Sequence, residues 1–369
     1  MPRRLIVAWL VIAFSLVGPS ATARQSDSAC DRFGEGSSVA RVKSAKLTEI
    51  SGLVASRRHP GVYWAHNDSG GKPEVFALRL DGTDLGSYPL SGASARDWED
   101  IAIGPKVGAS GPHLYAGDIG DNNDRRDHVT IYRVPEPAAA PVAPGRSLTG
   151  GDSFDLRYPA GPENAESLLV DPVTGDLVII TKSILGRSRI LTAPSASMVN
   201  GATVTMQDRG VVRMGPAAQA SGPLVTGADI SADGSLILVR TYGTVSGFER
   251  APGQAVAAAL RSAACSAPHV DETQGEAIAI AVDGSRYVTI SEGARPSINV
   301  FPIAGTRPTA APAASTTATP RPSMTVAEEE PGAIDGDATR PVVVAVLLIA
   351  GVLTVVMVRR RMIGRDGEI

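Results

Sequence analysis

The sequence predicts an all-β protein, a β-propeller of five blades with six as the alternative. Five copies of one pattern recur along the chain, each an apolar run, a turn and a second apolar run. The copies start at Ser51-Gly52-Leu53, Glu99-Asp100-Ile101, Glu166-Ser167-Leu168, Ala228-Asp229-Ile230 and Glu276-Ala277-Ile278. Such repetition of short strands and Gly, Pro and Asp turns is typical of a radial array of blades. Outside the two ends no apolar run has helical periodicity, which argues against a helical fold.

The last repeat lacks an outer strand, and the segment Ser38–Ala45 ahead of the first repeat is free to supply it. Closure of the ring by this N-terminal strand would remove the exposed sheet edges of an open array. Two of the four intervals between copies are long enough to hold a sixth, degenerate blade. The sequence therefore predicts a closed ring and favours five blades.

The two cysteines, Cys30 and Cys265, both lie in the part of the chain that we expect to be exported. In an oxidising compartment an even pair of cysteines indicates a disulfide. Cys30 precedes the closing strand, and Cys265 lies in the fourth blade. A bridge between them would staple the ring shut, whereas the alternative is two unrelated buried thiols.

The two ends of the chain predict its compartment. Residues 1–23 combine a basic start, a short apolar core and the sequence Ala21-Thr22-Ala23, as in a cleaved secretory signal peptide. Residues 341–358 are uncharged and apolar, and an arginine block follows at once. We expect a transmembrane helix there, with residues 359–369 as a short cytoplasmic tail and the N-terminal domain outside the cell membrane. A buried core helix is the alternative.

Between the predicted fold and the predicted anchor, residues 305–340 are rich in Pro, Thr and Ala. Such a composition buries little apolar surface, so we expect an extended stalk. This leaves residues 30–304 as the propeller ectodomain. Without the arginines and acids of the signal and the tail, the chain keeps 29 basic and 36 acidic residues, a charge of −7. The acidic balance and the lack of a basic stripe argue against nucleic acid as a partner.

Carboxylates recur at the first position of the repeat, which would line a central channel. Glu99, Glu166 and Glu276 occupy it in three copies and would converge in space. Like charges that close need a cation or a proton. Oxygen ligands without clustered His or Cys suit Ca²⁺ or Mg²⁺ rather than zinc. The alternative is a solvated acidic funnel with ion pairs to Lys182 and Arg240.

The predicted site is therefore a set of metal ligands with further channel residues around them, and Ca²⁺ is the expected cofactor. The predicted metal ligands are Glu99, Glu166, Glu276, Asp118, Asp68 and Asp100. The predicted ligand-binding and channel residues are Asn67, Asp121, Asn122, Lys182, Arg240 and Glu292.

Four motifs near the N-terminus carry a resemblance to a known group of proteins. They are Ile50-Ser51-Gly52-Leu53, His66-Asn67-Asp68-Ser69-Gly70, Asp97-Trp98-Glu99-Asp100-Ile101-Ala102 and Gly117-Asp118-Ile119-Gly120-Asp121-Asn122. Over about residues 45–135 the chain resembles exported bacterial β-propellers related to the phytase-like ("esterase-like activity of phytase") propellers. The resemblance implies an acidic channel that holds several calcium ions, as in the members that hydrolyse phosphomonoesters. The dense basic phosphate pocket of those members has few counterparts here, namely Lys182, Arg125, Arg126 and Arg240.

No catalytic residue is assigned from the sequence, because it has no Gly-x-Ser-x-Gly, no His-Glu-x-x-His and no phosphate-binding glycine loop with lysine. We expect a membrane-anchored extracytoplasmic module that binds an extracellular protein or a small ligand. The alternative is a metal-dependent hydrolase of phosphate or carboxylic esters, in which a cation held by Glu99, Glu166 and Glu276 activates water. A structural role in the cell wall is a third possibility.

Overall fold

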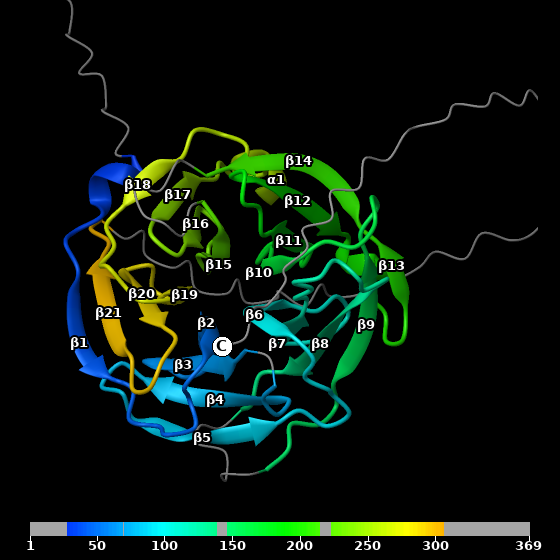
Figure 1. Cartoon of the computed structure of the whole chain (residues 1–369), viewed down its shortest axis with the longest axis horizontal. Coiled ribbons are helices and arrows are strands. Elements are labelled where there is room, and N and C mark those ends of the chain that lie inside the picture. Colours follow the sequence, from blue (N-terminus) through cyan, green and yellow to red (C-terminus); the bar gives the residue numbers. More distant parts are fainter. Residues whose placement is uncertain (1–27, 69, 139–145, 215–222, 306–369) are drawn as a thin grey trace, which may run out of the picture. The chain divides into compact units, whose positions relative to one another are not determined.

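Five β-sheets surround one axis in the computed structural model, which describes residues 28–68, 70–138, 146–214 and 223–305 (Figure 1). Four sheets have four strands and one has five. The arrangement is radial, so each sheet is one blade of a propeller. This confirms the predicted all-β propeller and, within the described residues, the count of five blades rather than six.

Each blade is built mainly from strands that follow one another in the chain. Blade 1 contains β2 (Ile50–Ala55), β3 (Val62–Asn67), β4 (Glu74–Arg79) and β5 (Asp84–Pro89). Blade 2 contains β6 (Trp98–Pro105), β7 (Pro112–Asp118), β8 (Val129–Pro135), β9 (Asp152–Arg157) and β13 (Thr203–Thr205). Blade 3 contains β10 (Ala165–Val170), β11 (Leu177–Thr181), β12 (Arg187–Ala193) and β14 (Gln207–Arg213).

The last two blades include the remaining strands. Blade 4 contains β15 (Val225–Ile230), β16 (Leu236–Thr241), β17 (Val245–Glu249) and β18 (Cys265–Ala267). Blade 5 contains β19 (Gly275–Ile280), β20 (Arg286–Ser291), β21 (Ser297–Pro302) and β1 (Ser37–Arg41). Three short helical turns complete the described elements: η1 (Ala29–Arg32), η2 (Ser195–Ser197) and α1 (Val256–Ala259).

The innermost strands β2, β6, β10, β15 and β19 contact one another in sequence order, and β19 contacts β2. All residues of β2, β10, β15 and β19 are buried. A strand covered by a neighbouring blade on each face gains from apolar residues at every position, which explains the near-continuous apolar runs. The core is thus a closed ring of inter-blade contacts around the axis.

Two buried aspartates of the innermost strands tie neighbouring blades together. The Asp100 carboxylate accepts hydrogen bonds from the backbone N–H groups of Ile101 (2.8 Å) and of Leu168 in blade 3 (2.9 Å). Asp229 of blade 4 likewise accepts from Ile230 (2.8 Å) and from Ile280 of blade 5 (2.6 Å). Each carboxylate therefore satisfies a backbone donor of the next blade in the ring.

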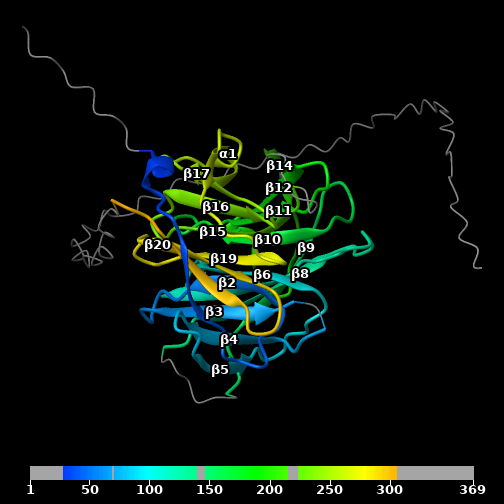
Figure 2. The same cartoon turned by 60° about the vertical axis from the view of Figure 1, so that its left-hand side comes forward.

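The N-terminal strand closes the ring as the sequence predicts. β1 pairs antiparallel with β21, from Ser37 opposite Val300 to Arg41 opposite Ser297. Figures 1 and 2 show the blue β1 beside the orange β21 at the outer edge of blade 5. The observed strand starts one residue earlier than expected and ends at Arg41 rather than at Ala45.

The segments that carry the two cysteines are neighbours in space. Cys30 belongs to η1, which contacts β17 and β18, and Cys265 begins β18. A Cβ atom added at Gly247 would contact both the Cys265 Sγ atom and the Phe33 ring at 3.2 Å. The placement agrees with the expected pairing, and the disulfide itself stays a prediction because the Cys30 side chain lies outside the described residues.

Two local features depart from a simple succession of strands within each blade. The segment after η2 is divided between two blades: β13 pairs in parallel with β9 of blade 2, and β14 pairs with β12 of blade 3. Buried Met206 lies between them, and its N–H donates to Arg157 O (2.9 Å). In blade 4 the alanine-rich run before β18 forms α1, because alanine is the best helix former and three of its four residues are buried.

No helix among the described residues has the length and apolar character needed to cross a membrane. The predicted signal peptide (1–23), the stalk beyond Gly305, the transmembrane segment (341–358) and the tail (359–369) lie outside the described residues. These four assignments stay predictions from the sequence.

Candidate cation site at one end of the propeller axis

Three carboxylates from three blades meet at the end of the axis where the innermost strands begin. Glu99 of β6, Glu166 of β10 and Glu276 of β19 each place one carboxylate oxygen within 4.8 Å of the others. All three side chains are buried, with residue exposures of 2%, 2% and 4%. The structure thus brings together the three glutamates that the repeat register singles out. Their mutual repulsion must be relieved by protons or by a cation.

A β-bulge in each inner strand pair aims these glutamates at the axis. The pairing skips one residue between Trp98 and Asp100, between Ala165 and Ser167, and between Gly275 and Ala277. The skipped residues are Glu99, Glu166 and Glu276. A bulged residue is free of the ladder and can be redirected, which is why bulges are frequent beside functional sites.

In blade 4 the bulge places a different residue at the axis from the one that the repeat predicts. There the pairing skips the residue between Val225 and Gly227, so Thr226 is the counterpart of the glutamates, two residues before the expected Ala228. The Thr226 hydroxyl donates to Gly275 O (2.8 Å), and Ser51 of blade 1 donates to Glu99 O (2.5 Å). The axis is therefore surrounded at this level by three carboxylates and two hydroxyls.

Glu99 is the most exceptional of the three glutamates. Among the described residues, no hydrogen-bond donor and no cationic group contacts its carboxylate, although the residue is 2% exposed. Burial raises the pKa of Glu99 well above its ordinary value, and Glu166, Asp68, Asp97 and Glu276 raise it further. A buried carboxylate without a donor has to bind a proton or a cation to offset its desolvation.

The other two glutamates have protein partners. Lys182 Nζ lies 2.8 Å from Glu166 Oε1 and also donates to the Tyr242 hydroxyl (3.0 Å). Burial raises the pKa of Glu166, against the opposing effect of Lys182. Burial alone would lower the pKa of Lys182, but Glu166 more than offsets it, so that the lysine stays charged. The single Ser51 O–H is shared between Glu99 O and Glu276 Oε2, which lies 3.2 Å from the hydroxyl oxygen.

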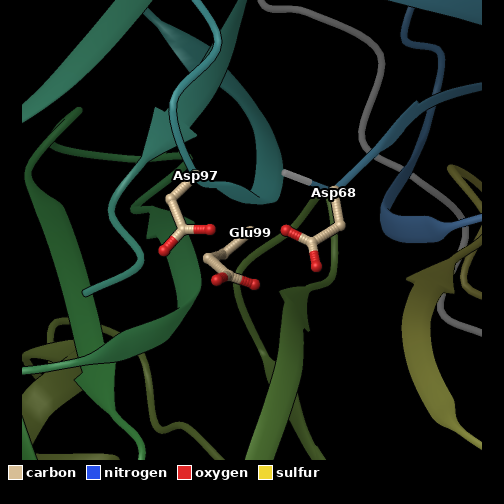
Figure 3. Close-up of side chains that lie close together, drawn as sticks. All are labelled: Asp68, Asp97 and Glu99. Atoms are coloured by element: carbon tan, nitrogen blue, oxygen red, sulfur yellow. The ribbon is translucent and has the colours of Figure 1, made fainter. Parts of the chain in front are cut away.

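A second group of carboxylates shares Glu99. Oxygens of Asp68, Asp97 and Glu99 lie within 4.8 Å of one another, and Figure 3 shows the three side chains pointing toward a common centre. Asp68 follows β3 and Asp97 precedes β6, so the loops of blades 1 and 2 supply them. Burial raises the pKa of Asp97, and Asp68 raises it further. We call the five residues Asp68, Asp97, Glu99, Glu166 and Glu276 the carboxylate cluster.

Glycine at position 120 permits this arrangement. A Cβ atom at Gly120 would overlap Glu99 Oε1 and the Asp97 carboxylate. Its N–H donates to Asp97 O (3.1 Å) and its carbonyl accepts from Arg126 (2.9 Å), so the backbone is held against the cluster from both sides. The loop after β7 therefore forms one wall of the site.

Asp118, predicted as a metal ligand, and Asp121, predicted as a channel residue, hold that loop and do not belong to the cluster. The Asp118 carboxylate accepts from the Arg126 guanidinium (2.6 Å) and from the N–H groups of Arg96 and Asp97 (both 3.2 Å). Asp121 Oδ2 accepts from the N–H groups of Arg125 and Arg126, both at 2.6 Å. Their carboxylates are used by donors of this loop and by the backbone ahead of β6, which shapes the wall that contains Gly120.

Two further predicted site residues make contacts between blades. The Asp100 carboxylate, expected among the metal ligands, accepts the two backbone N–H groups described above. Arg240, expected in the channel, is buried, forms an ion pair with Glu272 and donates to Ala277 O (2.9 Å). Arg240 thus binds blade 4 to blade 5 and does not pair with the cluster.

The remaining predicted channel residues lie around the cluster. Asn67 donates to Lys46 O (2.7 Å) and accepts from Glu49 N–H (3.2 Å), so it fixes the chain before blade 1. Asn122 accepts from Asn164 (3.0 Å), which also donates to Glu166 (3.1 Å). Glu292 accepts from Gln274 (2.6 Å), and burial together with Asp68 raises the pKa of Glu292 to about 7.

The sequence reasoning missed several residues of the site: Asp97, Gly120, Asn164, Thr226 and Tyr242. Asp97 was recognisable, because it lies two residues before the repeat start Glu99-Asp100-Ile101. Tyr242 follows β16 at the level where Lys182 follows β11, so equivalent loop positions would have paired them. Thr226 was hidden by the bulge, which no sequence pattern marks.

A groove of about 840 Å³ lies at the other end of the blades, between blades 3 and 4. Most of its charged side chains already have partners within the protein: Arg250 forms an ion pair with Asp171, and Asp233 accepts hydrogen bonds from Ser231 and Ser235. The wall of the groove at Asp171–Asp176 precedes β11, whereas Lys182 follows β11. The groove is thus distinct from the carboxylate cluster.

Without divalent cations, the free energy of unfolding is expected to fall as the pH rises from about 6.5 to about 8. Burial, Glu166 and Glu292 raise the pKa of Glu276 from 4.5 to about 8. The folded state therefore binds more protons than the unfolded state in this window, and unfolding becomes easier as these protons leave, by up to about 1.4 kcal/mol per pH unit for one group. Burial lowers the pKa of His66 to about 4, an opposite effect confined to lower pH.

Urea unfolding in EDTA at the two ends of this window measures the effect. Glu276→Gln should flatten the dependence, because its side chain no longer titrates. Stability that rises toward pH 8 in the unsubstituted protein would contradict the charge arrangement described here.

No protein-family model matches the chain, and no curated protein matches it. Among solved structures, the nidogen/laminin complex is similar at 15% identity and a TM-score of 0.34, over 66% of this chain and 73% of that chain. The WD40 repeats of RRP9 are similar at 10% identity and a TM-score of 0.34, over 68% and 79%. Likeness at this level carries no argument about function, so the propeller assignment rests on the sheet topology. The resemblance to the phytase-like group stays a prediction from the sequence.

Proposed function

We propose that this protein is a propeller module that binds a divalent cation, Ca²⁺, in the carboxylate cluster and recognises a ligand or protein partner at the same end of the axis. The observation that carries the proposal is the Glu99 carboxylate. It is buried, receives no donor from the described residues and belongs to both carboxylate groups. A divalent cation beside it would neutralise the repulsion and supply the missing partner.

The donor set fits calcium better than other biological metals. Ca²⁺ takes six to eight oxygen ligands in flexible geometry, and the cluster offers carboxylates from five residues with the hydroxyl of Ser51 nearby. Neither cysteine nor histidine belongs to either carboxylate group, and thiolate and imidazole are what zinc and copper favour. Lys182 already neutralises part of Glu166, so Glu99, Asp97, Asp68 and Glu276 would contribute most of the binding.

The proposal includes the setting of the module in the cell. The chain would be exported through the signal of residues 1–23 and held at the membrane by residues 341–358, with residues 305–340 as a spacer. A disulfide between Cys30 and Cys265 would secure the closing strand, a pairing supported by the contact of η1 with β18. The propeller would then lie outside the cell.

Glu99→Gln is expected to weaken Ca²⁺ binding at least tenfold, roughly 1.4 kcal/mol or more, because it removes a charge common to both carboxylate groups. Isothermal titration and calcium-dependent thermal unfolding of the full chain measure the loss. Glu74→Gln is the matched control: it removes a half-buried carboxylate at the start of β4, outside both groups, and should leave affinity unchanged. Equal affinity in both variants, or no binding by the unsubstituted protein, would refute the proposal.

A hydrolase is the second candidate, favoured by Lys182 and Tyr242 beside Glu166. The ammonium and the hydroxyl could orient an anionic substrate oxygen, and a bound cation would supply Lewis-acid activation of water. Phosphatase and esterase assays with p-nitrophenyl phosphate and p-nitrophenyl acetate distinguish the two functions. Calcium binding without turnover supports the binding module, and turnover abolished by Glu166→Gln supports the hydrolase.

A further inference from the structure

The loop between β11 and β12 presents two adjacent apolar side chains to solvent. Ile184 is 79% exposed and Leu185 is 77% exposed, the highest values among the large apolar side chains of the described residues. The turn is tight: Gly186 N–H donates to Ser183 O (3.1 Å), and Gly186 has a positive φ of 65°. Single exposed apolar side chains are ordinary on protein surfaces, whereas two neighbours held at a tip indicate an interaction site.

Two arginines that have no counter-ion in the described part of the chain flank this tip. Arg187 of β12 lies directly opposite Arg213 of β14, and both are exposed. Among the described residues, neither side chain has a hydrogen bond or an ion pair, whereas Arg189 on the same strand pairs with Glu163 and Asp208. Like charges directly opposite each other on a strand pair are destabilising, so the edge of blade 3 carries a cost that an anionic partner would relieve.

The tip belongs to the same end of the propeller as the carboxylate cluster. Ile184 lies two residues after Lys182 in the chain, and the Lys182 ammonium contacts Glu166. The turn of residues 171–176 lies at the other end of β11, a strand of five residues. A partner of the cluster end would therefore contact the tip as well.

We propose that the tip, formed by Ile184, Leu185, Arg187 and Arg213, docks on a membrane surface that contains anionic lipids. A protruding apolar pair can insert into the headgroup region without a preformed pocket, while guanidinium groups bind lipid phosphates with two hydrogen bonds. A folded protein partner would need a pocket complementary to the tip. The proposal rests on the proposed function in one respect: the acidic cluster nearby repels an anionic surface until a cation neutralises it.

Tryptophan quenching in the full chain tests this docking. Leu185→Trp places an indole at the tip, and vesicles of brominated phosphatidylcholine, with or without phosphatidylglycerol, quench an inserted indole. Trp64 and Trp98 are 0% and 1% exposed and stay shielded, and Trp9 belongs to the predicted signal. Val173→Trp is the matched control, because Val173 is 72% exposed at the opposite end of the same blade.

We expect the Leu185→Trp protein in calcium to be quenched by vesicles with phosphatidylglycerol and the Val173→Trp protein to be unaffected. Adding Arg187→Gln and Arg213→Gln should lower the ratio of docked to undocked protein roughly tenfold. Quenching that weakens in EGTA supports both the docking and the bound cation. Quenching that EGTA leaves unchanged supports docking and shows that docking does not need the cation. Equal quenching without phosphatidylglycerol, quenching of the control, or no quenching at all would overturn the proposal; the last would assign the tip to a protein partner.

Discussion

Asp171→Ala is expected to lower the free energy of unfolding by about 3–5 kcal/mol, because it leaves a buried guanidinium without its counter-ion. Arg250 donates to both oxygens of Asp171, at 3.0 and 2.7 Å, and the two side chains are 7% and 5% exposed. Asp171 follows β10 and Arg250 follows β17, so the pair joins blades 3 and 4. Urea unfolding of the purified protein measures the change.

A surface ion pair of the same blade provides the control. Asp208 pairs with Arg189 but is 43% exposed, so Asp208→Ala should cost at most about 1 kcal/mol. Replacing both partners, as Asp171→Leu with Arg250→Met, should recover much of the loss, since no unpaired charge stays buried. If Asp171→Ala and Asp208→Ala cost the same, the buried pair does not hold the blades together.

Gly120→Ala is expected to abolish Ca²⁺ binding while the propeller stays folded. The added Cβ would overlap the carboxylates of Glu99 and Asp97, so both must move away from their common centre. Carboxylates displaced by an ångström or so lose the convergence on which cation binding depends. Calcium titration by calorimetry measures the affinity, and far-ultraviolet circular dichroism checks the fold.

Gly117→Ala is the matched variant for this experiment. Its added methyl would lie 3.2 Å from Leu168 Cδ2 and 3.3 Å from Asp100 O, in tight contact but with no carboxylate of the cluster. Some loss of stability with unchanged calcium affinity is expected. Loss of affinity in both variants would mean that the end of β7 and the loop after it are merely sensitive to substitution, and the specific role of Gly120 would be wrong.

The blades and their closure were predictable because they depend on local chemistry. The innermost strands are apolar at nearly every position, and turns rich in Gly, Pro and Asp separate them, so Leu177–Thr181 and Leu236–Thr241 are recognisable as buried strands. The need to cover the last sheet edge identified the N-terminal segment as the closing strand. β13 depends on parallel pairing with β9, which is distant in the chain, and no local pattern marks it.

The candidate site was predictable only in part, because an acid looks the same in sequence whatever donors surround it. Glu99, Glu166 and Glu276 were identified by their place in the repeat, which the ring converts into proximity. Asp118 and Asp100 have the same chemistry, yet backbone N–H groups or Arg126 occupy their oxygens. Whether a carboxylate meets a donor or another carboxylate is decided by the loop path and by the neighbouring blade.

Taken alone, the sequence determined the repeating strand pattern, the order of the blades, the closing segment and the three glutamates at one level of the ring. These follow from hydrophobic periodicity, turn chemistry and position in a repeat, all of which are local properties. The tertiary structure decided the bulges that turn the glutamates inward and substitute Thr226 for Ala228. It also decided which acids are satisfied, and that Glu99 meets no donor among the described residues, because hydrogen-bond satisfaction depends on groups brought together from distant parts of the chain.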